Sequence, residues 1–213
     1  MFDTGSGRWY TAALIESVEK ILLGATGGMV AKKELNTVQE VLFWSYANIA
    51  MAHTAVDRKQ AKYATFNYMI RAKLFKGLIE GTMNIRTLFD DEKEKLLSGT
   101  KCSYCGSTEN LALDHIFAKK LGGKDTGDNL IYACRSCNSS KGKKDMMEWM
   151  NGQNSFPPLM VLRRYLKLVV SYCIENNLME CQVNEVQNQM HPFNIEYIPV
   201  SFPKPSELVL VIE

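Results

Sequence analysis

Four of the six cysteines in the chain form two C-x-x-C pairs, Cys102/Cys105 and Cys134/Cys137. A tight turn within each pair brings its two sulfurs to one side, so the pairs together can supply four thiolates to one tetrahedral ion. Four sulfur ligands close the site, which is typical of structural zinc rather than of a catalytic metal. We expect zinc to contribute much of the folding free energy here, because the short, hydrophilic segment between the pairs cannot form its own core.

A second set of residues lies between and just after these pairs and indicates a function beyond zinc binding. The run contains Leu113-Asp114-His115-Ile116, Gly122-Gly123, Asp128-Asn129-Leu130 and Cys134-Arg135-Ser136-Cys137-Asn138 with Lys141. In this order it resembles the HNH (ββα-metal) endonuclease family. The third signature position is Asn138, where many family members carry histidine, so the resemblance is to an HNN variant. It implies a strand–strand–helix catalytic unit between Cys102 and about Met150.

Hydrolysis of a phosphodiester needs a nucleophilic water, stabilisation of charge on the phosphoryl oxygens and help for the leaving oxygen. His115 suits the role of proton acceptor, because histidine gains and loses a proton near neutral pH. Asp114 and Asn138 offer hard oxygen ligands for Mg²⁺ or Mn²⁺ and leave coordination positions open for water and phosphate. The family resemblance adds Asn129 as a residue that holds the loop and the imidazole.

The geometry of a strand constrains these roles. Adjacent strand residues face opposite sides, so we expect the strand to bend or end at Asp114 and His115. Each residue also has an ordinary alternative: a turn hydrogen bond for Asp114, a satisfied strand histidine for His115 and a helix cap for Asn138. Together, at family spacing inside a zinc frame, they favour catalysis. On this reading, Asp114→Ala abolishes cleavage and leaves folding largely intact.

Basic residues flank this segment and are candidates for nucleic-acid binding: Lys119, Lys120, Lys124, Arg135, Lys141, Lys143 and Lys144. Such a cluster contacts phosphates without reading base sequence. Lys141 lies three residues beyond Asn138 on the same helical face, which would bring it to the scissile phosphate. A second basic stretch with interleaved aromatic residues covers residues 58–76, where DNA contact and a merely solvated helix face both remain open. Arg163, Arg164 and Lys167 form a third, weaker patch.

The surrounding patterns predict an α+β fold in three parts. A mainly helical region covers residues 1–97, with helical periodicity over 8–22, 58–79 and 90–97 and a further helix opened by Asn36; it could contribute DNA recognition. The zinc-stapled ββα-metal unit covers 98–150, with strands at 111–116 and 129–133 and a helix from about 137 to 149. Residues 151–213 add a helix launched by Pro157-Pro158 and one or two short edge strands over 195–212.

Bulk properties limit the classes of protein to consider. Hydrophobic residues make up 46% of the 213 residues, enough for a core, and a net charge of +2 does not by itself indicate a polyanion partner. The sequence shows neither a bilayer-spanning apolar run nor a signal peptide, so we expect no membrane association and a cytoplasmic location. Reducing conditions there disfavour disulfides as the purpose of the cysteines.

Two functions from different classes compete. The first is a metal-dependent endonuclease acting on DNA, as a restriction or other defence enzyme or, alternatively, as a homing nuclease. The second is a non-catalytic zinc module that binds nucleic acid or protein, which would not need Asp114, His115 and Asn138 together. One active site per chain would favour a homodimer if both DNA strands are cut.

Overall fold

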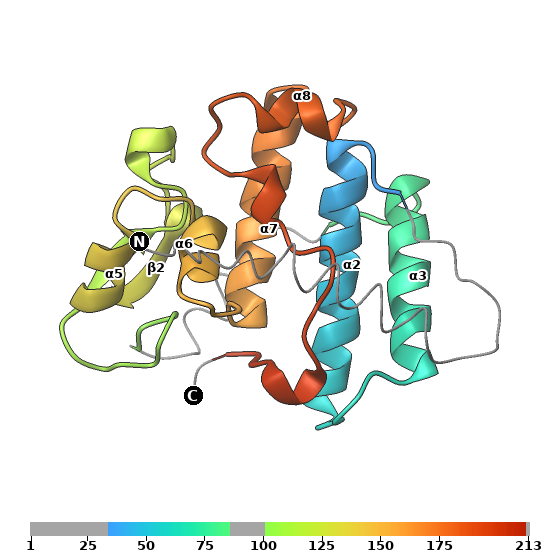
Figure 1. Ribbon diagram of the computed structural model, residues 1–213, viewed down its shortest axis with the longest axis horizontal. Helices are drawn as coiled ribbons and strands as arrows, with labels where there is room; N and C mark the ends of the chain where they lie inside the picture. The colour runs from blue at the N-terminus through green and yellow to red at the C-terminus, as the bar shows by residue number, and fades with distance from the viewer. Residues whose placement is uncertain (1–33, 86–100, 212–213) are drawn as a thin grey trace, which may run out of the picture. The chain divides into compact units, whose positions relative to one another are not determined.

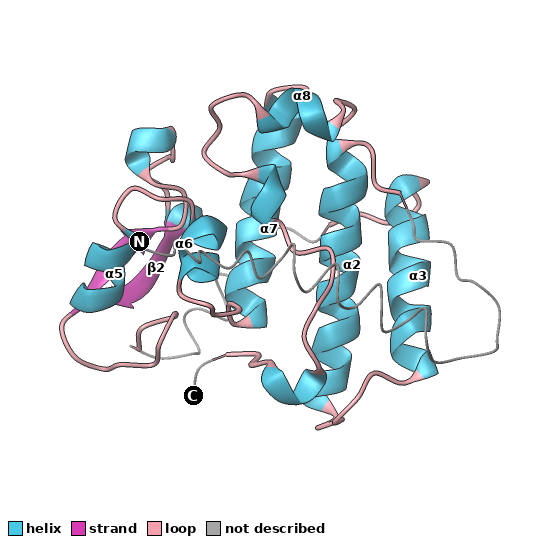
Figure 2. Ribbon diagram, in the orientation of Figure 1, coloured by secondary structure: helices cyan, strands magenta, loops and turns pink. Residues whose placement is uncertain are grey.

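The computed structural model describes residues 34–85 and 101–211, so the helices expected over 8–22 and 90–97 lie outside the described residues. The chain divides into two compact units, Met1–Glu34 and Leu35–Glu213, and residues 35–85 and 101–211 belong to the second. Its helices and strands confirm the α+β class (Figures 1 and 2). The described α-helices are α2 (Val38–Asp57), α3 (Thr65–Ile79), α5 (Arg135–Lys141), α6 (Met146–Gly152), α7 (Leu159–Glu175) and α8 (Val183–Gln187).

Helix α2 lies between α7 and α3 (Figure 1). It begins after Thr37 rather than Asn36, because Thr37 and Glu40 form a capping box in which each side chain accepts the other's backbone N–H. Helix α3 begins at Thr65, later than the expected Arg58, because the chain turns through Lys59, whose φ is 53°. Neither α2, α3 nor any other helix within 34–85 and 101–211 has the length and hydropathy to cross a membrane.

Two antiparallel strands and a helix form the central unit. Strand β1 (Leu111–His115) pairs with β2 (Leu130–Cys134), with Leu111 opposite Cys134 and His115 opposite Leu130. Both strands match the expected spans to within one residue at each end. The helix expected after Cys137 is two helices, α5 and α6, because Gly142 ends α5 with a positive φ of 54°. The ββα arrangement is therefore formed by β1, β2 and α5.

The edge strands expected over residues 195–212 are wrong. Within the described part of that segment, Ile195–Tyr197 (η3) and Pro205–Glu207 (η4) are short 3-10 helices. The carbonyl groups of Val209 and Leu210 instead accept hydrogen bonds from the backbone N–H groups of Leu159 and Met160. The first turn of α7 lacks internal acceptors for these N–H groups, so the C-terminal segment satisfies it instead of pairing as a strand.

One hydrophobic cluster joins the strand–helix unit to the long helices. Tyr165 of α7 is fully buried and packs edge-on against Phe117, the second residue after β1, with ring centroids 5.7 Å apart. Trp149 of α6 packs in the same way against Tyr104, with ring centroids 4.9 Å apart. Side chains of this size each contribute about 1.5–3 kcal/mol when buried. Helix α7 therefore packs against the loop after β1, and α6 packs against the first cysteine loop.

Candidate functional site

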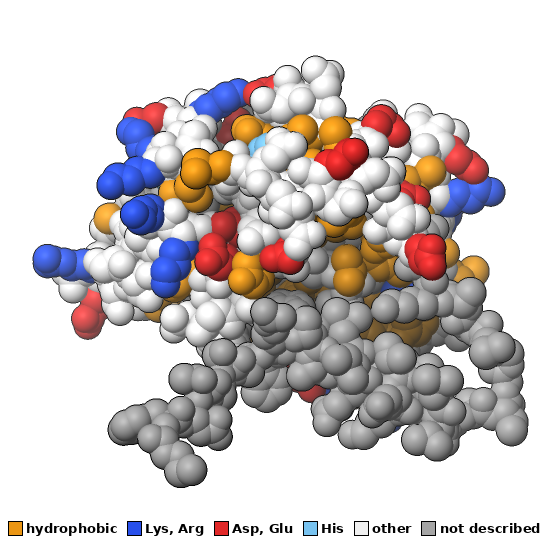
Figure 3. Space-filling model, turned by 45° about the horizontal axis from the view of Figure 1, so that its top comes forward, with side chains coloured by type: hydrophobic (Ala, Val, Ile, Leu, Met, Phe, Trp, Pro, Cys, Tyr) orange, Lys and Arg blue, Asp and Glu red, His pale blue; other side chains and the backbone are white. Residues whose placement is uncertain are grey.

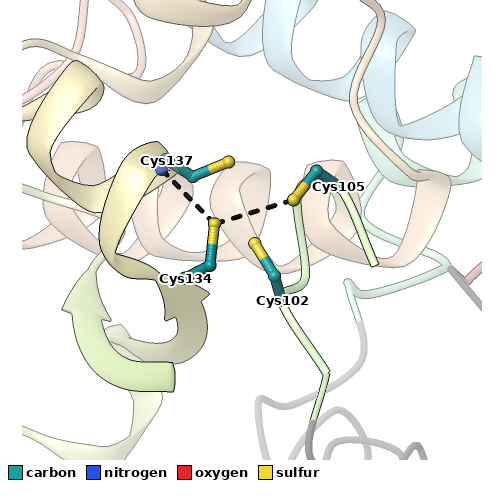
Figure 4. A group of neighbouring side chains, drawn as sticks. All are labelled: Cys102, Cys105, Cys134 and Cys137. Atoms are coloured by element: carbon teal, nitrogen blue, oxygen red, sulfur yellow. Dashed lines mark hydrogen bonds between the residues drawn. The ribbon is translucent and has the colours of Figure 1, made fainter. Parts of the chain in front are cut away.

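The four paired cysteines come together as expected. Their sulfur atoms all lie within 4.8 Å of one another, with Cys102 and Cys105 on a loop and Cys134 and Cys137 at the junction of β2 and α5 (Figure 4). A tetrahedral site with metal–sulfur bonds of about 2.3 Å has sulfur–sulfur edges of about 3.8 Å. The Cys105 and Cys134 sulfurs are 3.7 Å apart. The soft donor set and its spacing thus fit a structural zinc ion held by these four residues.

The second cysteine pair also begins helix α5. Cys134 is the N-cap of this helix, and its sulfur accepts the backbone N–H of Cys137 at 3.4 Å. This hydrogen bond lowers the pKa of the Cys134 thiol, which favours the thiolate that binds metal. Zinc ligation at Cys134 and Cys137 would therefore hold the start of α5 next to the start of β1, where Leu111 lies opposite Cys134.

Asp114 lies at the next-to-last position of β1 and is 5% exposed. Its Oδ1 accepts from Lys141 Nζ at 3.1 Å, and its Oδ2 accepts from the Tyr104 hydroxyl at 2.9 Å. Desolvation raises the pKa of Tyr104 well above its ordinary value, with the adjacent Asp114 carboxylate as the next cause, so Tyr104 stays a hydroxyl donor. The Asp114 carboxylate is thus held in one orientation by two buried donors. The sequence did not indicate that Tyr104 and Lys141 would have this role.

Lys141 is not the surface phosphate contact that its position on the helix predicted. Its side chain is fully buried, and its ammonium donates to Asp114 and, at 2.8 Å, to the backbone oxygen of His115. A buried charge without a partner is strongly destabilising. Asp114→Ala would leave this ammonium buried without its carboxylate partner. We therefore expect this variant to be destabilised, contrary to the expectation from the sequence.

Lys141→Met should destabilise the protein by about 3–5 kcal/mol, because it leaves the Asp114 carboxylate buried with only a neutral donor. Urea unfolding would measure the loss. Lys143→Met is the matched control, since it removes the same charge from an exposed position two residues away and should change stability by about 0.5 kcal/mol or less. Equal stability of the two variants would show that the buried ion pair contributes nothing.

His115 is the last residue of β1, so the strand ends at the Asp114–His115 pair, as its geometry required. The imidazole is 22% exposed, and its Nε2 lies 2.7 Å from Oδ1 of Asp125. The other carboxylate oxygen of Asp125 accepts from Lys119 Nζ at 2.9 Å. Asp125 was not identified from the sequence as a functional residue. The available signal in the sequence was a carboxylate ten residues after His115, beyond the tight turn at Gly122-Gly123, which could have indicated a partner for the imidazole.

Asn129 is buried and holds the loop between the strands, as the family resemblance implied. Its Oδ1 accepts from the backbone N–H of Phe117 at 2.7 Å, and its Nδ2 donates to the carbonyl groups of Phe117 and Lys124, each at 2.9 Å. These hydrogen bonds go to the backbone, while the imidazole of His115 meets Asp125. Asn129 therefore acts on the loop and reaches the imidazole only through it.

Gly123 makes this loop geometry possible. A Cβ added at this residue would lie 2.0 Å from the backbone oxygen of Phe117, so Gly123→Ala must displace the loop. We expect a loss of about 1–3 kcal/mol in the free energy of unfolding, measured by urea denaturation. Gly127→Ala in the same loop is the control, because a Cβ there meets no atom within 4 Å. If both variants unfold at the same urea concentration, the close approach at Gly123 does not matter.

Asn138 lies in the middle of α5, partly exposed, four residues after the helix-capping Cys134. Its amide oxygen and the carboxylate of Asp114 are hard donors of the kind that Mg²⁺ and Mn²⁺ prefer. Each Asp114 oxygen accepts one hydrogen bond and keeps a second lone pair. The two residues thus carry donor atoms suited to a divalent ion, one on β1 and one on α5.

The remaining basic residues of the segment are exposed: Lys119, Lys120, Lys124, Arg135, Lys143 and Lys144. Figure 3 shows Lys and Arg side chains gathered on the side where Figure 1 places the strands and α5. Lys124 also pairs with Glu175 of α7 at 2.8 Å. The prediction of a weak basic surface patch on α7 is wrong for two of its three residues, because Arg164 and Lys167 are buried. Arg164 donates to the carbonyl groups of Gly127 and Asp128 and so anchors the loop.

Residues 102–144 match the family model described as HNH endonuclease. No curated protein and no solved structure matches the chain. The match covers the zinc cluster, both strands, the loop between them and α5. The chain therefore carries an HNH endonuclease domain in this segment, and the resemblance inferred from its motifs is confirmed. A nuclease or other nucleic-acid-directed function follows in general terms.

Proposed function

We propose that the HNH domain at residues 102–144 makes this protein a metal-dependent endonuclease that hydrolyses phosphodiester bonds in DNA. One observation carries the proposal. The family match falls on the segment where the four-sulfur cluster lies at the start of β1 and of α5, while β1 ends in Asp114 and His115 and α5 bears Asn138. A zinc module that only binds nucleic acid has no need of a base and hard-oxygen ligands in the same segment.

The residues divide the chemistry among them. His115 takes a proton from the attacking water. Asp114 and Asn138 would hold Mg²⁺ or Mn²⁺, which when bound would neutralise charge on the phosphoryl oxygens and assist the leaving oxygen. Asn129 keeps the loop in place. The exposed basic residues Lys119, Lys120, Lys124, Arg135, Lys143 and Lys144 bind flanking phosphates without reading base sequence.

We also propose a biological role for this nuclease. A restriction or other defence nuclease is the first choice, with a homing nuclease as the alternative. DNA recognition would come from the parts outside the domain, residues 1–97 and 151–213, and cleavage of both strands would require two chains. A cytoplasmic location remains an expectation from the sequence.

The direct test is cleavage of supercoiled plasmid by the full-length protein with Mg²⁺ or Mn²⁺, with no added ion, and with EDTA. We expect nicked or linear product only with the added ion. Binding of DNA in a gel-shift assay without any cleavage, under all of these ions, would support the non-catalytic zinc module instead. Sequencing the ends of cleaved DNA would then reveal site preference and the stagger between cuts.

A further inference from the structure

The carboxylate that faces His115 is held by its loop on both sides. Asp125 follows Lys124, whose carbonyl accepts from the side chain of Asn129, and precedes Thr126, whose carbonyl accepts from the backbone N–H of Asn129 at 2.9 Å. Arg164 anchors the next two residues through their carbonyl groups. An exposed ion pair by itself contributes about 0–1 kcal/mol. The loop backbone, rather than the attraction between the charges, therefore places this carboxylate.

The hydrogen bond between His115 and Asp125 has a defined donor and acceptor. Lys119 first and His115 second lower the pKa of Asp125, which keeps the carboxylate ionised at neutral pH. An ionised carboxylate only accepts hydrogen bonds, so the 2.7 Å contact requires a proton on Nε2 of His115. In the neutral imidazole the free lone pair is then on Nδ1.

We propose that Asp125 is a positioning residue that orients the imidazole of His115 and leaves Nδ1 as the atom that accepts the proton of the attacking water. This inference rests on the proposed nuclease function. As the water oxygen bonds to phosphorus and the bond to the leaving oxygen breaks, the water proton passes to Nδ1, and the leaving oxygen takes a proton from solvent. The imidazolium so formed keeps its Nε2–H directed at Asp125. Asn129 thus acts on the base indirectly, by fixing the two residues beside Asp125.

The first test is a double-mutant cycle on plasmid cleavage with saturating Mg²⁺. Asp125→Ala should lower kcat about 10–100-fold with little change in KM, as is typical when a residue that orients a functional histidine is removed. Asp125→Glu should recover part of this loss. In a His115→Ala background, Asp125→Ala should cause no further loss, because Asp125 acts only through the imidazole.

Asp128→Ala is the matched control. It removes a negative charge from the same loop at a residue anchored through its backbone, so it should keep the wild-type kcat. If Asp125 acted only by repelling the substrate phosphates, Asp125→Ala would lower KM rather than kcat. An equal loss from Asp125→Ala with and without the imidazole would overturn the proposal.

The second test does not depend on activity. The chain has only three histidines, His53, His115 and His191, so ¹⁵N-labelled imidazole signals can be assigned by removing His115. Asp125→Ala should shift the Nε2 signal of His115 and leave those of His53 and His191 in place. No shift would show that the contact is absent in solution and would overturn the inference even in an active enzyme. A shift with no cleavage by wild-type protein would instead contradict the nuclease function.

Discussion

His115→Ala should lower the rate of phosphodiester cleavage by a factor of about 10²–10⁴, the contribution typical of a positioned general base. The protein should keep its fold, because the side chain is 22% exposed and its carboxylate partner is largely in solvent. Removing the imidazole therefore leaves no buried polar group without a partner. Single-turnover cleavage of plasmid, beside circular dichroism of both proteins, measures the two effects separately.

This substitution separates catalysis from structure better than any change at Asp114. The Asp114 carboxylate is bonded to Lys141 and Tyr104 in the interior, so its removal lowers stability and activity together. His53→Ala is a control that removes another imidazole outside the HNH domain. If His115→Ala and wild type cleave at the same rate with Mg²⁺, His115 is not the base and the proposed mechanism fails.

Loss of the four-sulfur metal site should have the largest effect on folding. Structural zinc contributes about 10–16 kcal/mol of folding free energy in small metal-dependent domains, and a two-stranded sheet such as β1–β2 is marginal by itself. Cys105→Ser should therefore abolish zinc binding and unfold residues 101–150. Metal analysis of the purified protein, together with limited proteolysis, would detect both changes.

Cys181→Ser is the matched control for this experiment. Cys181 is a free cysteine that is partly exposed and lies outside the sulfur cluster, so its replacement should leave zinc content and protease resistance at wild-type levels. We expect one zinc ion per wild-type chain. Equal protease resistance of Cys105→Ser and Cys181→Ser would mean that packing against α6 and α7, and not the metal, stabilises the unit.

Local patterns predicted the features that depend on a few neighbouring residues. The spacing within each cysteine pair determines where its sulfurs point, and short apolar runs bounded by turns located β1 and β2 to within a residue at each end. The proline pair correctly predicted the start of α7. In each case the conformation follows from interactions within one turn or one strand, which the order of residues specifies directly.

Features that depend on packing between distant segments were not predictable in this way. Lys141 looked like a surface residue because it lies in a basic segment, three residues beyond Asn138, yet α5 packs its ammonium onto Asp114, 27 residues away in the sequence. The β-branched C-terminal segment looked like a strand, but the unsatisfied N–H groups at the start of α7 were the available partners for its carbonyls. Burial and pairing are properties of the assembled elements.

The sequence alone therefore identified the four cysteines that cluster and the residues suited to phosphodiester chemistry, because residue type and short spacing specify both. The tertiary structure decided how the catalytic candidates are held: Asp114 by buried donors, and His115 by a carboxylate on a loop that Asn129 anchors. These contacts form only once β1, the loop and α5 have packed together, since Lys141 lies 27 residues from Asp114 and the fold of the loop brings Asp125 to His115.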